Sequence, residues 1–212
     1  MDNDGVLPMV LRSSCMSPPI SSCTPIGYIQ IVGLMALDFM VSEARRYKMR
    51  LILSLCNNWE DYGGKAQYVR WGKDASVDLT SDDDFFSDPT LKGYYKAFVE
   101  DVLSRINTIK NEAYKDDPTI LAWELINEPR CPSDPSCDTL QAWIEEMASY
   151  VKSIDTVHLV KIGIEGYYGS STPELLLINP DDYSGHERHI QFVTTWMQQH
   201  IDDVANLLAM PI

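Results

Sequence analysis

The stretch DPTILAWELINEPR, residues 117–130, decides the fold class of this chain of 212 residues. Its apolar part, residues 119–126, is short and lies between polar residues and prolines, which is typical of a strand buried in a parallel sheet. Apolar runs of the same kind occupy residues 50–56 and 158–164. These three runs are therefore predicted to be strands of one parallel sheet.

Amphipathic helical patterns alternate with the three strands. Apolar residues recur at helical spacing from Leu34 onward, after the N-cap pair Asp88 and Pro89, after Asp138, and in residues 187–208. This alternation predicts an α/β fold with right-handed crossovers. It leaves two architectures open, a doubly wound open sheet and part of a (β/α)8 barrel. No GxGxxG or GxxxxGK[ST] motif follows a strand, which argues against a nucleotide-binding version.

The composition limits the class of partner. The chain carries 31 acidic and 17 basic side chains, a net charge of −14, which disfavours binding to the phosphate backbone of nucleic acids. No stretch of 18 apolar residues lacks charges, so we expect no membrane span. We expect a soluble protein with a core of ordinary size and a neutral or cationic partner.

Metals and cofactors are not indicated. Residues 57–88 have the composition of a long polar loop, with six aspartates from Asp74 to Asp88. Their spacing fits no EF-hand, so a solvated loop that ends in a helix N-cap is favoured over a calcium site. His186 and His189 form HERH rather than HExxH, and no CxxC pair occurs. We expect neither a metal nor an organic cofactor.

The cysteines and the N-terminal residues bear on the compartment and the domain limits. Five cysteines cannot all pair within one chain. Cys131 and Cys137 are expected either to form a disulfide in an oxidising compartment or to stay two free thiols. Residues 1–33 are expected to form an irregular segment, and residues 34–212 the main domain. The first residues lack a basic region, so we expect no signal peptide in them.

Polar side chains follow each predicted strand at the end where α/β proteins place their functional sites. Asn58 and Trp59 follow the first strand, Asn127 and Glu128 end the second, and Tyr167 follows the third. Amides and carboxylates bind sugar hydroxyls, and aromatic rings cover the apolar faces of pyranoses. This pattern indicates a carbohydrate site.

Glu128 is the strongest catalytic candidate. A carboxyl group at the end of an apolar strand is partly removed from water, which favours the protonated form that a general acid needs. The alternative is that Glu128 caps the next segment or pairs with Arg130. Glu124 is interpreted as structural, and Glu165 as either a supporting group or a solvated loop acid.

Five longer stretches, residues 36–72, 117–131, 139–155, 162–169 and 190–203, carry a family likeness over most of the chain. They resemble the plant endo-β-1,4-mannanases of glycoside hydrolase family 5. The resemblance implies a (β/α)8 TIM barrel, here incomplete with about three full strands. It also implies retaining hydrolysis of internal β-1,4-mannosidic bonds in mannan, glucomannan and galactomannan, and secretion from the cell.

The resemblance assigns roles to the candidate residues. Glu128, in the Asn-Glu-Pro that ends the fourth barrel strand of the family, matches the proton donor, and Asn127 matches a ligand of a substrate hydroxyl. Asn58, Trp59 and Tyr167 are placed in or near the cleft. The implied partner is a mannan-type polysaccharide, without nucleic acid or membrane.

The second catalytic carboxylate is missing from the sequence. A retaining glycosidase needs two carboxyl groups about 5–5.5 Å apart, one of them the nucleophile. In the family this nucleophile is a glutamate at the end of the seventh strand, and the sequence reaches only the entry to that strand at residues 210–212. The family's sixth-strand His-x-Tyr pair and its first two strands are not recognisable either. We expect this polypeptide alone to lack mannanase activity.

Two other functions stay open. One is a non-catalytic carbohydrate-binding relic that uses Asn127, Trp59 and Tyr167, for which binding of mannooligosaccharides without turnover is the evidence. The other is a doubly wound small-molecule binder that shares only the alternating pattern. An open sheet covered by helices on both faces would favour that second function.

Overall fold

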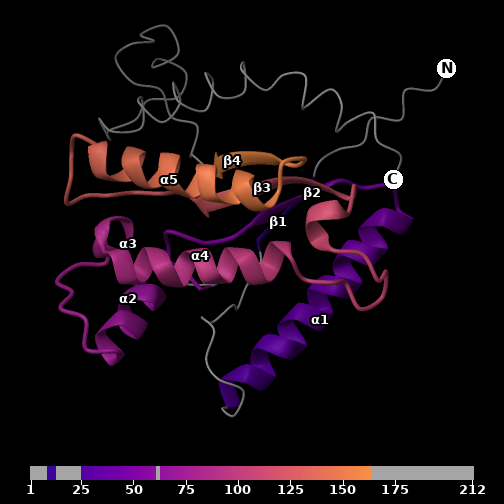
Figure 1. The fold of residues 1–212 in the computed structure, drawn as a ribbon, viewed down its shortest axis with the longest axis horizontal. Coiled ribbons are helices and arrows are strands. Elements are labelled where there is room, and N and C mark those ends of the chain that lie inside the picture. The colour runs from indigo at the N-terminus through magenta and orange to yellow at the C-terminus, as the bar shows by residue number, and fades with distance from the viewer. Residues whose placement is uncertain (1–8, 13–24, 61–62, 164–212) are drawn as a thin grey trace, which may run out of the picture.

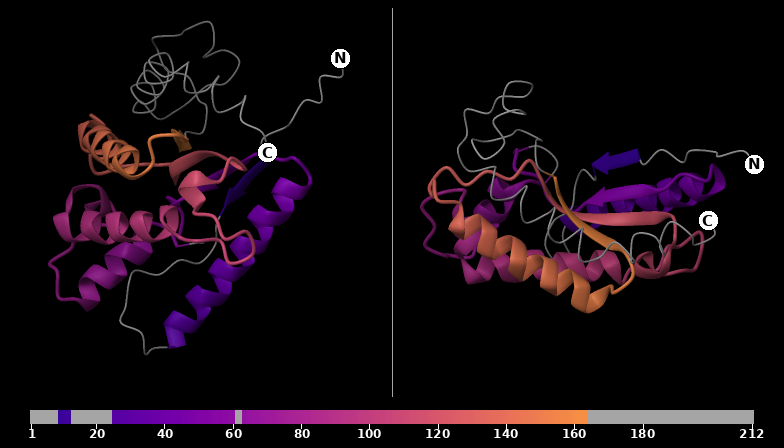
Figure 2. Two further views of the ribbon diagram at one scale, coloured as in Figure 1. Left: turned by 45° about the vertical axis from the view of Figure 1, so that its right-hand side comes forward. Right: turned by 90° about the horizontal axis from the view of Figure 1, so that it is seen from above.

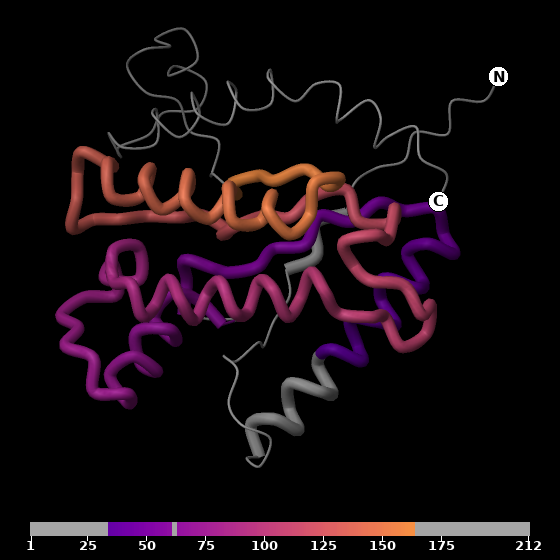
Figure 3. Tube along the Cα trace, in the orientation of Figure 1, coloured from indigo at the N-terminus to yellow at the C-terminus, as the bar shows by residue number. Residues whose placement is uncertain are grey.

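Four parallel strands form the sheet of the computed structural model, which describes residues 9–12, 25–60 and 63–163 (Figure 1). Figure 3 traces the same backbone as a tube. The strands are β1 (Met9–Arg12), β2 (Leu51–Ser54), β3 (Ile120–Asn127) and β4 (Leu159–Gly163). Their order in the sheet is β1–β2–β3–β4, and each neighbouring pair is parallel. A doubly wound sheet contains a point where the strand order reverses, whereas a barrel follows chain order. Within the described ranges the sheet follows the barrel order.

The helices follow one another around the same side of this sheet (Figures 1 and 2). They are α1 (Pro25–Arg46), α2 (Lys65–Asp74), α3 (Asp84–Ser87), α4 (Pro89–Leu103), the 3-10 helix η1 (Tyr114–Asp116) and α5 (Asp138–Ile154). In the part of the chain that the structure describes, none of them combines the length and hydrophobicity needed to cross a membrane. Strands inside and helices outside agree with a partial barrel.

An aromatic cluster fills the space between α2, α3, α4 and α5. Trp143 of α5 lies 5.4 Å from Phe85 of α3 and 5.1 Å from Tyr95 of α4, measured between ring centroids. Tyr68 of α2 lies 5.1 Å from Phe85. These side chains are at most 2% exposed. Large buried rings of this kind contribute most of the apolar surface that fixes the helices to one another.

The expected polar loop at residues 57–88 is wrong in part, because it contains α2 and α3. Both helices are short, and their buried residues, among them Tyr68 and Phe85, are scattered between aspartates, serines and lysines. Isolated helices of this length are marginal in water and depend on tertiary packing. The helical pattern of α2 and α3 is thus too short to detect in the sequence, and packing in the aromatic cluster stabilises both helices.

The N-terminal segment also differs from expectation. Strand β1 lies within residues 1–33, and α1 begins at Pro25 rather than at Leu34. A four-residue strand owes its stability to pairing, here with β2, and local composition does not reveal that pairing. The three predicted strands and the helices after Leu34, Pro89 and Asp138 are confirmed. The division of the chain at residue 33 stays a prediction, and the predicted helix at residues 187–208 lies outside the described residues.

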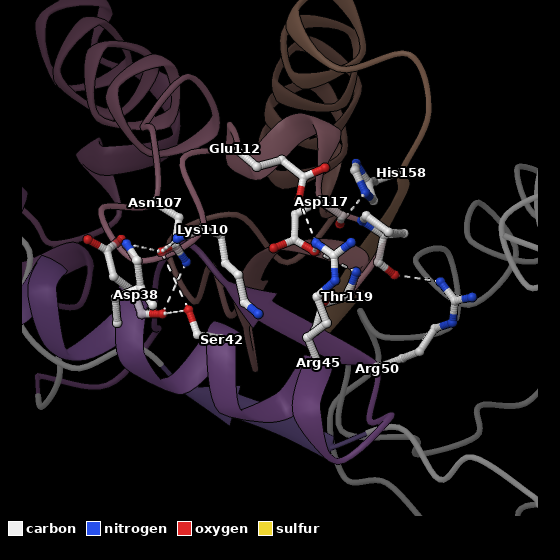
Figure 4. Close-up of polar contacts among 12 residues, drawn as sticks. Asp38, Ser42, Arg45, Arg50, Asn107, Lys110, Glu112, Asp117, Thr119 and His158 are labelled. Atoms are coloured by element: carbon white, nitrogen blue, oxygen red, sulfur yellow. Dashed lines mark hydrogen bonds and ion pairs between the residues drawn. The ribbon is translucent and has the colours of Figure 1, made fainter. Parts of the chain in front are cut away.

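The buried carboxylate of Asp38 holds α1 against the loop that follows α4. It is fully buried and accepts hydrogen bonds from Arg105 at 2.7 Å and from the Tyr114 hydroxyl at 2.7 Å. Figure 4 shows Ser42 and Asn107 donating to the Asp38 carbonyl. Burial alone would raise the pKa of Asp38, but the hydrogen bonds from Arg105, Tyr114 and Thr108 lower it below its usual value.

Polar contacts also join the N-terminal ends of the strands (Figure 4). Arg50, just before β2, donates to the Pro118 carbonyl at 2.5 Å. The ring of His158, just before β4, lies 2.7 Å from Asp155 and 3.1 Å from the Asp117 carbonyl. In a barrel this end of the sheet serves stability, and the opposite end carries function.

Candidate active site

Two asparagines meet at the C-terminal end of the sheet. Asn127, the last residue of β3, and Asn57, which follows β2, form a parallel β-bridge. The Asn127 side chain donates from Nδ2 to Asn57 Oδ1 at 3.0 Å, and both residues are 6% exposed. Because one of the two N–H groups of the Asn127 amide is used in this way, Asn57 fixes the orientation of the amide plane.

Strand β3 becomes irregular just before Glu128. Its register against β4 shifts between Glu124 and Asn127, and the buried hydroxyl of Tyr95 donates to the Leu125 carbonyl at 2.9 Å within this segment. Glu128 itself has φ 51°, in the left-handed region, and its N–H donates to the Gly163 carbonyl at 2.7 Å. A non-glycine residue in this region costs about 1 kcal/mol or more, and such residues cluster at functional sites. Strand irregularities next to active sites likewise re-aim side chains.

The carboxylate of Glu128 contacts the exposed ring of Trp59. Trp59 Nε1 donates to Glu128 Oε2 at 2.5 Å, and the indole is 47% exposed. The Arg130 guanidinium lies 5.4 Å from the centroid of the same ring, a cation–π distance. Glu128 thus contacts an aromatic side chain at the end of the sheet. The alternative that Glu128 caps the next segment or pairs with Arg130 stays a prediction.

Two glycines make the turn that presents Trp59. Gly63 has φ 72°, which L side chains rarely adopt. A Cβ at Gly64 would lie 1.8 Å from the Trp59 carbonyl oxygen and 2.8 Å from that of Asn57. Only glycine at position 64 permits this approach of backbone to backbone, so Gly64 lets the start of α2 lie against the Asn57 and Trp59 carbonyls.

Lys65, at the start of α2, ties this turn to the chain after Glu128. Its ammonium donates to Asp83 Oδ1 at 2.6 Å and to the Arg130 carbonyl at 2.7 Å. Asp83 Oδ2 accepts from the Ser133 N–H at 2.8 Å, and Asn58 Oδ1 accepts from the Arg130 N–H at 3.1 Å. Asn58 thus holds a loop backbone, whereas the sequence placed it among the sugar-binding candidates.

Glu124 lies four residues before Glu128 on β3 and is 1% exposed. Its Oε1 accepts a hydrogen bond from Lys161 of β4, and a Cβ at Gly163 would lie 2.8 Å from its carboxyl carbon. This paired and buried position supports the interpretation of Glu124 as structural, since a carboxylate removed from water requires a compensating cation or donor.

The thiols near the site are not activated. Burial raises the pKa of the Cys56 thiol to about 12. Cys131 and Cys137 are both buried and no disulfide joins them in the structure, so the alternative of a disulfide between them is not realised there. Among the described residues no cluster of His, Cys, Asp or Glu has the arrangement of a metal site. Asp88, at the end of the aspartate-rich segment, caps α4 by accepting from the backbone N–H groups of Thr90 and Leu91.

A family model described as GH family 5 beta-mannosidase-like matches residues 16–200. The chain belongs to this family. Its Asn127-Glu128 pair lies at the C-terminal end of a parallel strand, where barrel enzymes place their catalytic groups.

Plant mannanases are among the sequence relatives of this family 5 chain. Mannan endo-1,4-beta-mannosidases 7 and 8 of Oryza sativa subsp. japonica are each 69% identical to it over 84% of this chain. Mannan endo-1,4-beta-mannosidase 4 of Solanum lycopersicum is 47% identical over 83% of this chain. The matches cover 55%, 56% and 51% of these proteins, so the chain spans about half the length of the curated relatives it matches.

Solved family 5 barrels have the same fold. The endo-1,4-beta-D-mannanase of Thermotoga petrophila superposes with a TM-score of 0.62 at 32% identity, covering 82% of this chain and 57% of that chain. The endo-1,4-beta-mannanase of Rhizomucor miehei gives a TM-score of 0.59 at 39% identity, covering 64% of this chain and 39% of that chain. The fold of this family 5 chain is therefore a partial TIM barrel, and the doubly wound alternative is set aside.

The structure brings four of the five predicted site residues of the family 5 chain together, namely Asn127, Glu128, Asn58 and Trp59. Tyr167 lies outside the described residues, as do Glu165, His186 and His189. Sequence reasoning did not single out Asn57, Lys65 or Tyr95. Asn57 carried a signal, because it precedes Asn58 at a strand end, but nothing local distinguishes Lys65 from a surface lysine.

Proposed function

We propose that this chain carries the acid/base half of a β-mannan-cleaving site, with Glu128 as the general acid/base and Asn127 as a ligand of a mannose hydroxyl. The observation that carries the proposal is the hydrogen bond between Trp59 and Glu128 at the C-terminal end of β3. Membership of glycoside hydrolase family 5 supports the reaction class, retaining hydrolysis of β-1,4-mannosidic bonds in mannan, glucomannan or galactomannan. Secretion from the cell, which the resemblance to plant mannanases implies, is also part of the proposal.

The geometry suits this role. The half-buried Glu128 receives a donor on Oε2 from Trp59, which holds the carboxyl group in one orientation beside the bond to be cleaved. The exposed face of the Trp59 ring offers an apolar surface for a pyranose. Asn127 meets a hydroxyl with the part of its amide that Asn57 does not use. Tyr167 belongs to the proposed cleft from the sequence alone.

Cleavage needs a nucleophile as well as an acid. Covalent retaining hydrolysis requires a second carboxylate about 5–5.5 Å from the first. Glu124 lies on β3, which leads directly to Glu128, and its carboxylate is paired with Lys161 of β4. It therefore does not supply the second carboxylate. We propose that the polypeptide of 212 residues binds β-mannan chains but needs a second carboxylate from outside these residues to cleave them.

Titration calorimetry with mannohexaose tests the binding. The expected result is saturable binding that weakens about tenfold in Trp59→Ala, with weaker binding of cellohexaose, which differs from it at C2 of each sugar. Release of reducing ends from galactomannan is expected to stay at background. Failure to bind any mannooligosaccharide contradicts the proposed function, and clear turnover contradicts the need for an external nucleophile.

A chimera separates the proposed half-site from a carbohydrate-binding relic. The segment after β4 is replaced by the corresponding segment of the longer mannan endo-1,4-beta-mannosidase 7 of rice. Turnover by the chimera, abolished by Glu128→Gln, supports a competent acid/base, because the nucleophile is then supplied. A folded chimera that binds mannohexaose without turnover supports the relic instead.

A further inference from the structure

Glu128 depends on the backbone that follows it. In this segment the Arg130 N–H is held by Asn58, the Arg130 carbonyl by Lys65, and the Ser133 N–H by Asp83. Two of these three contacts belong to one ion pair, Lys65 with Asp83, whose side chains are 8% and 9% exposed. The buried salt bridge between Lys65 and Asp83, which lie far from this loop in the sequence, therefore stabilises the conformation of the loop after Glu128.

The position of Lys65 is unfavourable for a charged side chain. Lys65 opens α2, where the helix dipole disfavours a cation, and its ammonium is removed from water. Three neighbours offset this cost, namely the Asp83 carboxylate, the Arg130 carbonyl and the face of Phe86, whose ring centroid lies 5.2 Å from Nζ. A side chain that only packed the first turn of α2 would need no charge there.

The electrostatics of Asp83 agree with a tight pair. Burial alone would raise the pKa of Asp83, but the hydrogen bonds from Lys65 and Ser133 outweigh it and hold the pKa below its usual value. The carboxylate is thus ionised at neutral pH and can bind the ammonium on one oxygen and the Ser133 backbone on the other. The Lys65–Asp83 pair thus connects the segment after β2 to the loop that follows β3.

We infer that Lys65 is a positioning residue for Glu128. The Lys65 N–H donates to the Asn57 carbonyl at 2.9 Å, which fixes the Lys65 backbone. The Lys65 ammonium in turn donates to the Arg130 carbonyl and so fixes the Arg130 backbone. Fixing Arg130 places its guanidinium over Trp59, and Trp59 donates to Glu128. The consequence for sugar binding rests on the proposed function, whereas the effect on the Trp59–Glu128 contact does not.

The indole N–H of Trp59 reports this contact directly. In ¹H–¹⁵N correlation spectra its signal is assigned by its loss in Trp59→Phe. A hydrogen bond to a carboxylate makes the signal change with pH as that carboxylate titrates, and Glu128→Gln is expected to abolish this pH dependence. Both observations use the chain of 212 residues as it stands.

Removal of the lysine is the test. Lys65→Met is expected to shift the Trp59 indole signal, weaken its pH dependence and raise the Kd for mannohexaose about tenfold. Lys65→Arg, which keeps the cation, is expected to show smaller changes in all three properties. Arg105→Met is the matched control, because it breaks the Asp38 ion pair at the other end of the sheet and lowers stability without touching the loop. The control is expected to keep the wild-type indole signal.

A second variant covers the case in which Lys65→Met does not fold. Lys65→Met with Asp83→Leu replaces the buried pair by apolar side chains, an exchange that proteins commonly tolerate. The double variant is expected to fold and still lose the wild-type Trp59 signal. If it keeps that signal and its pH dependence, the inference is overturned. If the wild-type chain does not bind mannohexaose, the proposed function fails, and the indole signal still decides the role of Lys65.

Discussion

At the residue scale, contacts from neighbouring segments stabilise an unusual backbone conformation at Glu128. Glu128 adopts a left-handed φ of 51° just after a register shift in β3. Holding a glutamate there requires contacts that compensate the strain, and the Gly163 carbonyl and the Trp59 indole supply two of them. The position of the carboxyl group is thus an outcome of three separate segments of the chain.

Tyr95 gives a prediction at this scale. Its hydroxyl is buried and donates to the Leu125 carbonyl in the irregular part of β3. Tyr95→Phe is expected to lower the free energy of unfolding by about 1–3 kcal/mol, because a buried carbonyl loses this donor. Urea unfolding followed by circular dichroism measures the change. Tyr47→Phe, at a 66% exposed position, is the control and is expected to change stability by less than about 0.5 kcal/mol. Equal stability of both variants would contradict the prediction.

At the scale of elements, the start of α4 was predictable, whereas the existence of α2 and α3 was not. The pair Asp88 and Pro89 predicts the start of α4 correctly, since a capping carboxylate and a proline at the first position are local chemical requirements. The helices α2 and α3 were missed, because each is stabilised by rings that come from other helices. The sequence shows a cap within a few residues, but it does not show a partner far along the chain.

The cap of α4 is testable by itself. Asp88→Ala removes the acceptor for the backbone N–H groups of Thr90 and Leu91 and is expected to cost about 1 kcal/mol of stability. Chemical denaturation measures this cost. Asp78→Ala, in the exposed part of the same aspartate-rich segment, removes the same charge and is expected to be close to neutral. A neutral Asp88→Ala would show that the cap contributes nothing.

At the scale of the whole molecule, buried aspartates tie distant segments together and make stability depend on pH. The pKa values of Asp38, Asp83 and Asp155 are lowered, because hydrogen bonds from their partners outweigh the opposing effect of burial. A group whose pKa is lower in the folded chain stabilises the fold above its unfolded pKa, which is about 3.9 for aspartate. That stabilisation is lost as the pH falls below this value and through the folded pKa.

Urea midpoints measured between pH 7 and pH 3 test this linkage. They are expected to be nearly constant down to about pH 5 and to fall steeply below about pH 4. Asp38→Asn is expected to be less stable at pH 7 but to show a shallower decline, because one of the linked carboxylates is gone. A decline in the variant that parallels the wild type would exclude Asp38 from the linkage.

The sequence by itself determined the fold class, the three strands at residues 50–56, 119–126 and 158–164, and the catalytic candidates Asn127 and Glu128. These follow from local rules, since buried parallel strands are apolar and functional groups collect where they end. Only the tertiary structure decided that Asp38 is buried, that Asn58 holds the Arg130 backbone, and that Lys65 reaches across to the chain after Glu128. The two contacts to the Arg130 backbone join residues separated by 65 and 72 positions, and no local pattern encodes which distant polar group will compensate a buried charge.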